Sequence, residues 1–173
     1  IADSFLAQGE GTIAGLELFS GISSVVSRTA VGNGGDLSLD AREVTLSAGG
    51  RLDSSTFGRG DAGAITVNSS QFLAQGQTSK AFKSGIYSVV DSTAVGNANT
   101  ISITTPQLTL LDGAVLAADT AGQGNASTIV VNASQGVNIG TNSRLSVETT
   151  GPGTPGNITL TTPHLTIAND AQL

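Results

Sequence analysis

The sequence predicts an all-β fold, a right-handed parallel β-helix of three sheets with about five to six coils of roughly 28–36 residues. The main observation is a repeated phrase in which two alternating aliphatic runs and a third aliphatic position are separated by Gly, Asn, Ser and Thr. The first aliphatic position recurs in steps of 28, 36, 28 and 29 residues, at Leu37, Ile65, Ile101, Ile129 and Ile158. The second and third aliphatic positions recur with nearly the same period. The second falls at Val44, Phe72, Leu108, Val137 and Leu165, and the third at Ile22, Leu52, Ile86, Leu116, Leu145 and Leu173. A unit this short cannot close a core alone, so successive units must stack.

Composition is the second observation. The chain has 23 Gly, 38% hydrophobic residues and no Cys, Met or Trp. Turn residues are abundant, and the hydrophobic content is enough for one narrow core, which excludes simple disorder. We therefore expect residues 1–173 to form a single β-helix repeat domain.

Within a unit, alternation with period two predicts half-buried strands. Residues 101–103 (Ile-Ser-Ile) and 108–110 (Leu-Thr-Leu) place aliphatic side chains on one face and hydroxyl side chains on the other. Residues 104–106 (Thr-Thr-Pro) between them are expected to turn the chain. A third strand should open at the third aliphatic position, after a Gly-rich or Asn-rich corner. At ~4.8 Å per coil the rod would be roughly 25 Å long, and a right-handed coil follows from the hand of parallel connections.

Two coils contain insertions, which in solenoids often carry contacts. The 36-residue unit has about eight extra residues, which we place in a bulging loop, Gln77–Lys83. Lys80, Phe82 and Lys83 make this a possible contact loop. The corresponding stretch of the first coil, Glu10–Phe19, is longer by three residues.

The chain begins and ends inside a repeat. Residues 4–31 end in a phrase that returns 64 positions later, and Leu173 falls in the middle of a unit. No polar cap is visible at either end, so we expect a fragment of a longer solenoid or one link of an end-to-end assembly. Open strand edges would favour axial stacking of copies of the chain.

Charge and hydropathy exclude several classes of partner. The net charge is −6 with only seven Lys and Arg, which argues against nucleic acid. No stretch approaches the ~18 consecutive apolar residues of a membrane span. The absence of Cys excludes disulfides and thiolate metal sites. We expect no cofactor.

Catalytic candidates are few. The lone His164 occupies a slot that other coils fill with polar residues, so a solvent-facing side chain is the favoured interpretation, and a Ser-His-Asp arrangement has no base. A polysaccharide lyase or hydrolase is an alternative, and it would need carboxylates gathered on one face. The available carboxylates follow the third aliphatic position at different offsets: Asp53, Asp91, Asp119 and Glu148. We predict no catalytic residue and no enzyme.

Two short motifs have both a functional and a structural interpretation. Asp36, Asp40 and Asp61 form a weak acidic set for calcium, although solvated turn carboxylates explain them as well, and we predict no metal. Arg59-Gly60-Asp61 is the tripeptide that animal integrins recognise. Its Gly-rich corner needs such residues for turn reasons alone.

An outward column is the main candidate binding surface, formed by Ser38, Thr66, Ser102 and Thr159, with Val130 at the intervening position. A second column flanks it, Asp40, Asn68, Thr104, Asn132 and Thr161. Evenly spaced methyl and hydroxyl groups could bind ice or a flat glycan. The alternative is that Ser, Thr and Asn simply suit a solvated strand.

Two phrases carry a resemblance to a known family. Residues 96–114 (GNANTISITTPQLTLLDGA) and 156–167 (GNITLTTPHLTI) resemble the repeats of filamentous-haemagglutinin-type exoproteins of two-partner secretion. The resemblance covers nearly the whole chain and implies a right-handed β-helix shaft exported through an outer-membrane transporter of a Gram-negative bacterium. No secretion-domain residue can be assigned.

The expected function is therefore a non-catalytic, secreted or cell-surface shaft. It would act in adhesion, cell-cell contact, or extracellular fibre and matrix formation, with surface glycans or host or neighbouring cells as partners. A glycan- or ice-binding face and a polysaccharide-degrading enzyme are the competing classes.

Overall fold

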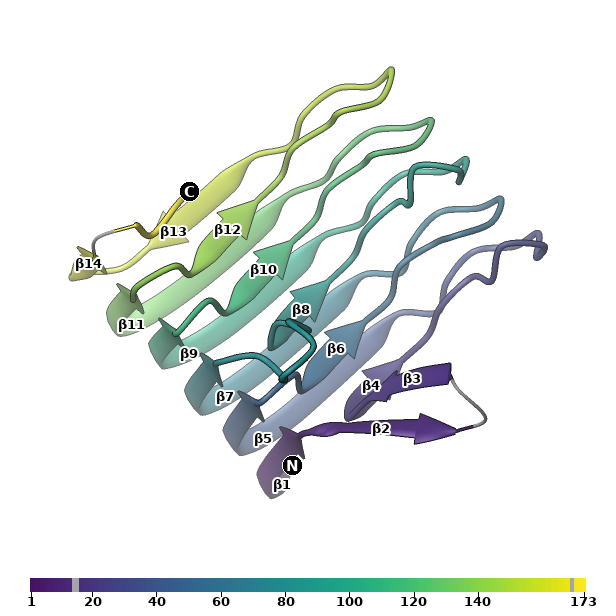
Figure 1. Ribbon diagram of the computed structural model, residues 1–173. Helices are drawn as coiled ribbons and strands as arrows, with labels where there is room; N and C mark the ends of the chain where they lie inside the picture. The colour runs from purple at the N-terminus through teal and green to yellow at the C-terminus, as the bar shows by residue number, and fades with distance from the viewer. Residues whose placement is uncertain (14–15, 169) are drawn as a thin grey trace.

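The chain winds as a right-handed parallel β-helix, in which each coil lies directly against the next (Figure 1). The computed structural model describes residues 1–13, 16–168 and 170–173. A large sheet runs along one side of the rod, and its order is β1 (Ala2–Gln8), β5 (Leu37–Ser47), β7 (Ile65–Gln75), β9 (Ile101–Leu111), β11 (Ile129–Ile139) and β13 (Ile158–Thr161), with β14 (Leu165–Ile167) also paired to β11. A small sheet faces it, in the order β12 (Arg144–Ser146), β10 (Val115–Ala117), β8 (Gly85–Tyr87), β6 (Arg51–Asp53) and β4 (Gly21–Ser23).

The predicted aliphatic columns are confirmed by the strand register. Ile65 pairs with Ile101, Ile101 pairs with Ile129, and Ile129 pairs with Ile158. The second and third columns keep register in the same way across the large and small sheets. Most members are inaccessible to solvent and form one continuous core. Burial of these stacked side chains is the main stabilising contribution, on the order of 1.5–3 kcal/mol each.

The polar break between the first two runs bends the strand without ending it. In β5, β7, β9 and β11 both runs lie in one 11-residue strand, so the first two faces form a single curved sheet. Only the last coil separates them, as β13 and β14. The core positions of β9 shift from Ile101 and Ile103 to Leu108 and Leu110, which are out of phase by one residue. The bend absorbs that residue, and the register between β9 and β11 is irregular there.

The corners before the small sheet require a left-handed backbone. Ala48 and Asp112, at the first central position of their turns, have φ of 46° and 52°, and Asn142 and Asp170, at the second central position, have φ of 58° and 62°. Among residues other than Gly, Asn and Asp adopt this left-handed region most readily, and Ala adopts it at a higher energetic cost. Gly85 shows a second constraint, because a Cβ there would lie 1.8 Å from the Val115 carbonyl oxygen of the next coil.

Serine side chains close the far loops of the first three coils, buried at Ser54 and Ser88 and half-buried at Ser24. The backbone N–H groups of three loop residues donate to three serine hydroxyls in the same internal column, Gly35 to Ser24, Gly63 to Ser54 and Asn99 to Ser88, at 2.8, 3.0 and 2.9 Å. The column continues with Ala118 and Val147, where the loops bond to backbone carbonyls instead. The sequence does not reveal this ladder, because serine in a loop-rich chain is also expected in turns.

Most of the inserted residues lie where the sequence predicts them, but two of the eight lie elsewhere. Residues 76–84 separate β7 from β8, whereas residues 112–114 separate β9 from β10, so six of the eight extra residues lie in this loop. The other two lengthen the far loop between β8 and β9. In the first coil, β2 (Glu10–Ile13) and β3 (Leu16–Phe19) form an antiparallel hairpin, and residues 14–15 of the predicted stretch lie outside the described residues.

Candidate binding surfaces on the shaft

The predicted outward ladder is a true column of the large sheet. Ser38 pairs with Thr66, Thr66 with Ser102, Ser102 with Val130, and Val130 with Thr159. Ser38, Thr66 and Thr159 are exposed, while Ser102 and Val130 are half-buried. Val130 interrupts the hydroxyl series in the middle of the column, so the ladder offers a row of evenly spaced groups with one aliphatic step.

The flanking column also stacks in register, from Asp40 to Thr161. In its N-terminal part the side chains bond to each other, because Asn68 Nδ2 donates a 2.9 Å hydrogen bond to Asp40 Oδ1. Its C-terminal part borders a depression in the surface: Thr104, Asn132 and Thr161 all line a groove.

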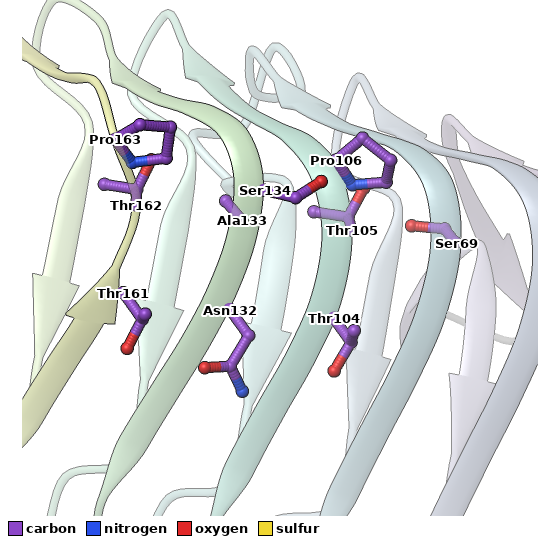
Figure 2. Close-up of a pocket in the computed structure, with 10 residues that line it drawn as sticks. All are labelled: Ser69, Thr104, Thr105, Pro106, Asn132, Ala133, Ser134, Thr161, Thr162 and Pro163. Atoms are coloured by element: carbon purple, nitrogen blue, oxygen red, sulfur yellow. The ribbon is translucent and has the colours of Figure 1, made fainter.

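That groove follows the bend of the large sheet across three coils and has a volume of about 460 Å³ (Figure 2). Three rows of side chains line it, together with Ser69 at the end nearest β7: Thr104, Asn132 and Thr161; Thr105, Ala133 and Thr162; and Pro106, Ser134 and Pro163. The middle row forms the floor, since Thr105 and Ala133 are each 2% exposed. We call this the bend groove.

A row of amides continues beyond the bend groove. Gln71, Gln107 and Gln135 line a neighbouring depression of about 390 Å³, which also includes Arg42 and Glu43. His164 follows the proline of the last coil and is exposed. The prediction that His164 is solvent-facing is therefore confirmed, although Val137 pairs with Leu165, which places Gly136 of β11, and not Gln135, beside His164.

The predicted contact loop packs against the shaft. The Phe82 ring lies over the Arg51 guanidinium, and the Lys83 carbonyl accepts hydrogen bonds from Arg51 Nε at 3.0 Å and Tyr87 Oη at 3.1 Å. Lys80 is exposed at the loop tip. Ser79 Oγ donates to Glu10 Oε1 of the first-coil hairpin at 3.1 Å, so the two insertions meet.

The insertions enclose a cationic side chain on the outer face of the small sheet. The Arg51 guanidinium lies 5.5, 5.4 and 4.6 Å from the ring centres of Phe19, Phe82 and Tyr87. Desolvation by burial is the main cause that raises the pKa of Tyr87 to about 12, and desolvation also raises the pKa of Asp53. We call Arg51 and the three rings the aromatic cluster. The repeat pattern does not predict this cluster, because its rings come largely from insertions, which have no counterpart in other coils.

The integrin-like tripeptide lies in a ladder of Asn and Asp side chains that links the far turns. Asp61 Oδ1 accepts hydrogen bonds from Asn97 N at 2.7 Å and Asn97 Nδ2 at 3.0 Å. Asn33 and Asn125 continue the ladder in the adjoining coils. Arg59 is exposed, while the Asp61 carboxylate is engaged within the fold.

The other members of the weak acidic set serve similar contacts. Asp36 Oδ1 accepts from Ala64 N at 2.8 Å, and Asp40 is held by Asn68. Within residues 1–13, 16–168 and 170–173, no group of three His, Asp or Glu side chains is placed to hold a metal ion.

The carboxylates weighed for a lyase or hydrolase are engaged in structural contacts, and two of them are linked, because Glu148 N donates a 2.8 Å hydrogen bond to Asp119 Oδ1. Asp53 Oδ1 accepts from Ser55 N at 3.0 Å, and Asp119 Oδ1 accepts from Ser146 Oγ at 2.6 Å. A hydrogen bond from Thr93 N is the main cause that lowers the pKa of Asp91. Glu148 forms a 2.7 Å ion pair with Arg144.

Comparison with known proteins gives no relative: no family model, no curated protein and no solved structure matches this chain. In the part of the chain that the structure describes, no helix has the length and apolar character needed to cross a membrane. The function of the chain is therefore inferred from its fold and its surfaces.

Proposed function

We propose that this chain is part of a non-catalytic shaft, secreted by a Gram-negative bacterium or held at its outer surface, that acts in adhesion, cell-cell contact or extracellular fibre formation. The supporting observation is that the long strands pair edge to edge in one sheet, which extends along a single axis. β5, β7, β9 and β11 are joined edge to edge over nearly their whole length. Such a rod spans distance and displays side chains at fixed intervals, which is what a shaft requires.

Export through an outer-membrane transporter is part of this proposal. It rests on the repeat wording of residues 96–114 and 156–167. A parallel β-helix suits such export physically, because each coil adds to the coil before it and folding can propagate from one end.

End-to-end stacking is the second part of the proposal. Leu165 and Ile167 of β14 are 47% and 48% exposed, at positions that are buried in the preceding coils. A further coil, from the same chain or another copy, would bury them. Sedimentation velocity at increasing concentration tests this: axial association gives longer species, and a monomer at millimolar concentration contradicts it.

The main proposal is tested by the cellular location of the protein. Antibodies raised against the folded chain should label intact source cells, or detect the protein in the medium, to the same extent as in lysed cells. Labelling that appears only after lysis would overturn an extracellular role. A periplasmic marker and a cytoplasmic marker, probed in parallel, control for leakage.

Adhesion is tested separately with beads. Beads coated with the folded chain should attach to Gram-negative cells or to epithelial cells more often than beads coated with the same chain after thermal unfolding. Equal attachment of both bead types would leave the shaft as a fibre component and remove adhesion from the proposal.

A further inference from the structure

The bend groove differs from the flat ladder beside it because it has walls and a floor. Its volume of about 460 Å³ falls in the ~300–1,000 Å³ range of small-molecule sites. The two outer rows are mainly exposed, whereas the floor is buried at Thr105 and Ala133. A ligand lying in the groove would therefore contact side chains on three sides.

The lining carries no charge, although the whole chain has a net charge of −6. All ten lining residues are Ser, Thr, Asn, Ala or Pro. An ionic ligand would lose hydration here without gaining an opposite charge, which is unfavourable. The groove therefore favours a neutral ligand.

The lining is also amphipathic. The floor is closed by the nearly inaccessible Thr105 and Ala133 and is half-exposed at Thr162. The Pro106 and Pro163 rings stand in the row on one side (Figure 2). The opposite row offers the hydroxyls of Thr104 and Thr161 and the amide of Asn132. A sugar ring has the matching pattern, with C–H groups on its faces and hydroxyls at its edges.

One hydroxyl at the end of the groove lacks a partner within the fold. Ser69 Oγ is buried and makes no hydrogen bond. In Figure 2 it points toward the neighbouring coil, on the side of Thr105. Rotation about χ1 of Ser69 would turn this hydroxyl to a ligand, and a hydrogen bond gained there would relieve the cost of an unsatisfied group.

The spacing between adjacent coils sets the repeat length that a ligand must match. Adjacent coils are ~4.8 Å apart, which is close to the length of one sugar residue in an extended β-linked chain. Thr104, Asn132 and Thr161 would thus meet three consecutive sugars. We propose that the bend groove binds a neutral, extended polysaccharide chain along the shaft axis, one sugar per coil. This goes beyond the shaft role, which stands whether or not the groove is occupied.

Titration calorimetry with the folded chain tests the proposal. The probes are cellohexaose, laminarihexaose and mannohexaose, with hexagalacturonate as the anionic comparison. At least one neutral hexasaccharide should bind saturably and more tightly than hexagalacturonate. Affinity for that sugar should rise up to the trisaccharide and change little beyond it. Absence of binding by all three neutral probes at millimolar concentration, or preference for the anionic probe, overturns the proposal.

Surface substitutions locate the site. Asn132→Ala should weaken binding roughly five- to tenfold by removing an amide partner. Ser134→Arg, on the exposed opposite row, should weaken it more than tenfold by placing an ion and its bulk in the groove. Asn138→Ala, on the same strand but outside the groove, is the matched control and should leave affinity unchanged.

The flat ladder provides the competing location. Ser102→Ala should not change sugar affinity if the bend groove is the site. Circular dichroism and the unfolding midpoint of each variant confirm that its fold is intact. Loss of binding in Ser102→Ala with normal binding in Asn132→Ala would overturn the proposal in favour of the ladder.

Discussion

Two arginines occupy the same column of the small sheet in different surroundings. Arg51 and Arg144 are linked by register through Gly85 and Val115. Arg51 is enclosed by the aromatic cluster, under the two insertions, whereas Arg144 forms an ion pair with the largely exposed Glu148. Each arginine is the first residue of a three-residue strand. Insertions between coils, and not the coils themselves, therefore decide whether a surface position becomes an interior one.

The largest expected effects lie inside the rod, where the two regions are alike. Leu52 and Leu116 pair with Ile86 from opposite sides and are 1% and 0% exposed. Leu52→Ala and Leu116→Ala should each lower the free energy of unfolding by about 2–5 kcal/mol, because each leaves a cavity in the aliphatic column. Urea denaturation measures both. A difference of more than about 2 kcal/mol between them would show that the insertions also change core packing.

On the surface of the rod, substitutions at the two arginines should have different effects on stability. Arg51→Ala removes three ring contacts and a hydrogen bond to the Lys83 carbonyl, so we expect a loss of about 2 kcal/mol. Arg144→Ala removes a partly exposed ion pair with Glu148 and a hydrogen bond to Ser146 Oγ, and should cost about 1 kcal/mol. Thermal unfolding of the two variants makes the comparison. Equal losses would mean that the aromatic cluster contributes nothing beyond an ordinary surface contact.

The buried carboxylate near the cluster should give a pH dependence. Desolvation holds the pKa of Asp53 above its ordinary value of 3.8, so the folded state binds this proton more tightly than the unfolded state. Its contribution to stability is full below pH 3.8 and is lost as pH rises through the raised pKa. Asp53→Asn keeps an acceptor for Ser55 N and should remove this loss. The measurement is the free energy of unfolding of variant and wild type from roughly pH 3 to 8.

Asp91→Asn is the control of opposite sign. The hydrogen bond from Thr93 N lowers the pKa of Asp91, so its contribution is present above pH 3.8 and is lost as pH falls. The stability difference between variant and wild type should therefore change with pH in the opposite direction from that of Asp53→Asn. Slopes of the same sign for the two variants would contradict the assignment of Asp53 as a desolvated group.

The smallest expected effect is at a corner beneath the loop. Ala48 adopts φ of 46°, while the equivalent position of the corner between β9 and β10 is Asp112, with φ of 52°. Ala48→Asn should raise the free energy of unfolding by about 0.5–1 kcal/mol, because Asn tolerates the left-handed region better. Ala126→Asn, at a position outside this region, is the control and should change stability little. A destabilised Ala48→Asn would indicate that the covering loop constrains this corner further.

The periodicity predicted the coils because one physical rule sets both. Leu37, Ile65 and Ile101 recur at steps that place them in neighbouring coils, and burial then fixes the register. The same steps mark Asn33, Asp61 and Asn97, so this ladder was readable from the sequence although the turn interpretation hid it.

Other features leave no periodic signal. The aromatic cluster depends on Phe19 and Phe82, which come from unique insertions. The bend groove arises from a one-residue change of phase within each long strand, which alternation alone does not convert into a depression. Residues 104–106 were predicted as a turn, and their stacking with the next two coils makes them a wall and floor instead.

The pairing between long strands is indifferent to what lies between them. β7 pairs with β9 across a 36-residue step in the same register that joins β5 to β7 across 28 residues. Duplication or deletion of one whole coil in the gene would thus lengthen or shorten the protein without a mismatch at the new junction. Such a molecule can change its reach in evolution by recombination between its own repeats, while substitutions and insertions within single coils alter its surface independently.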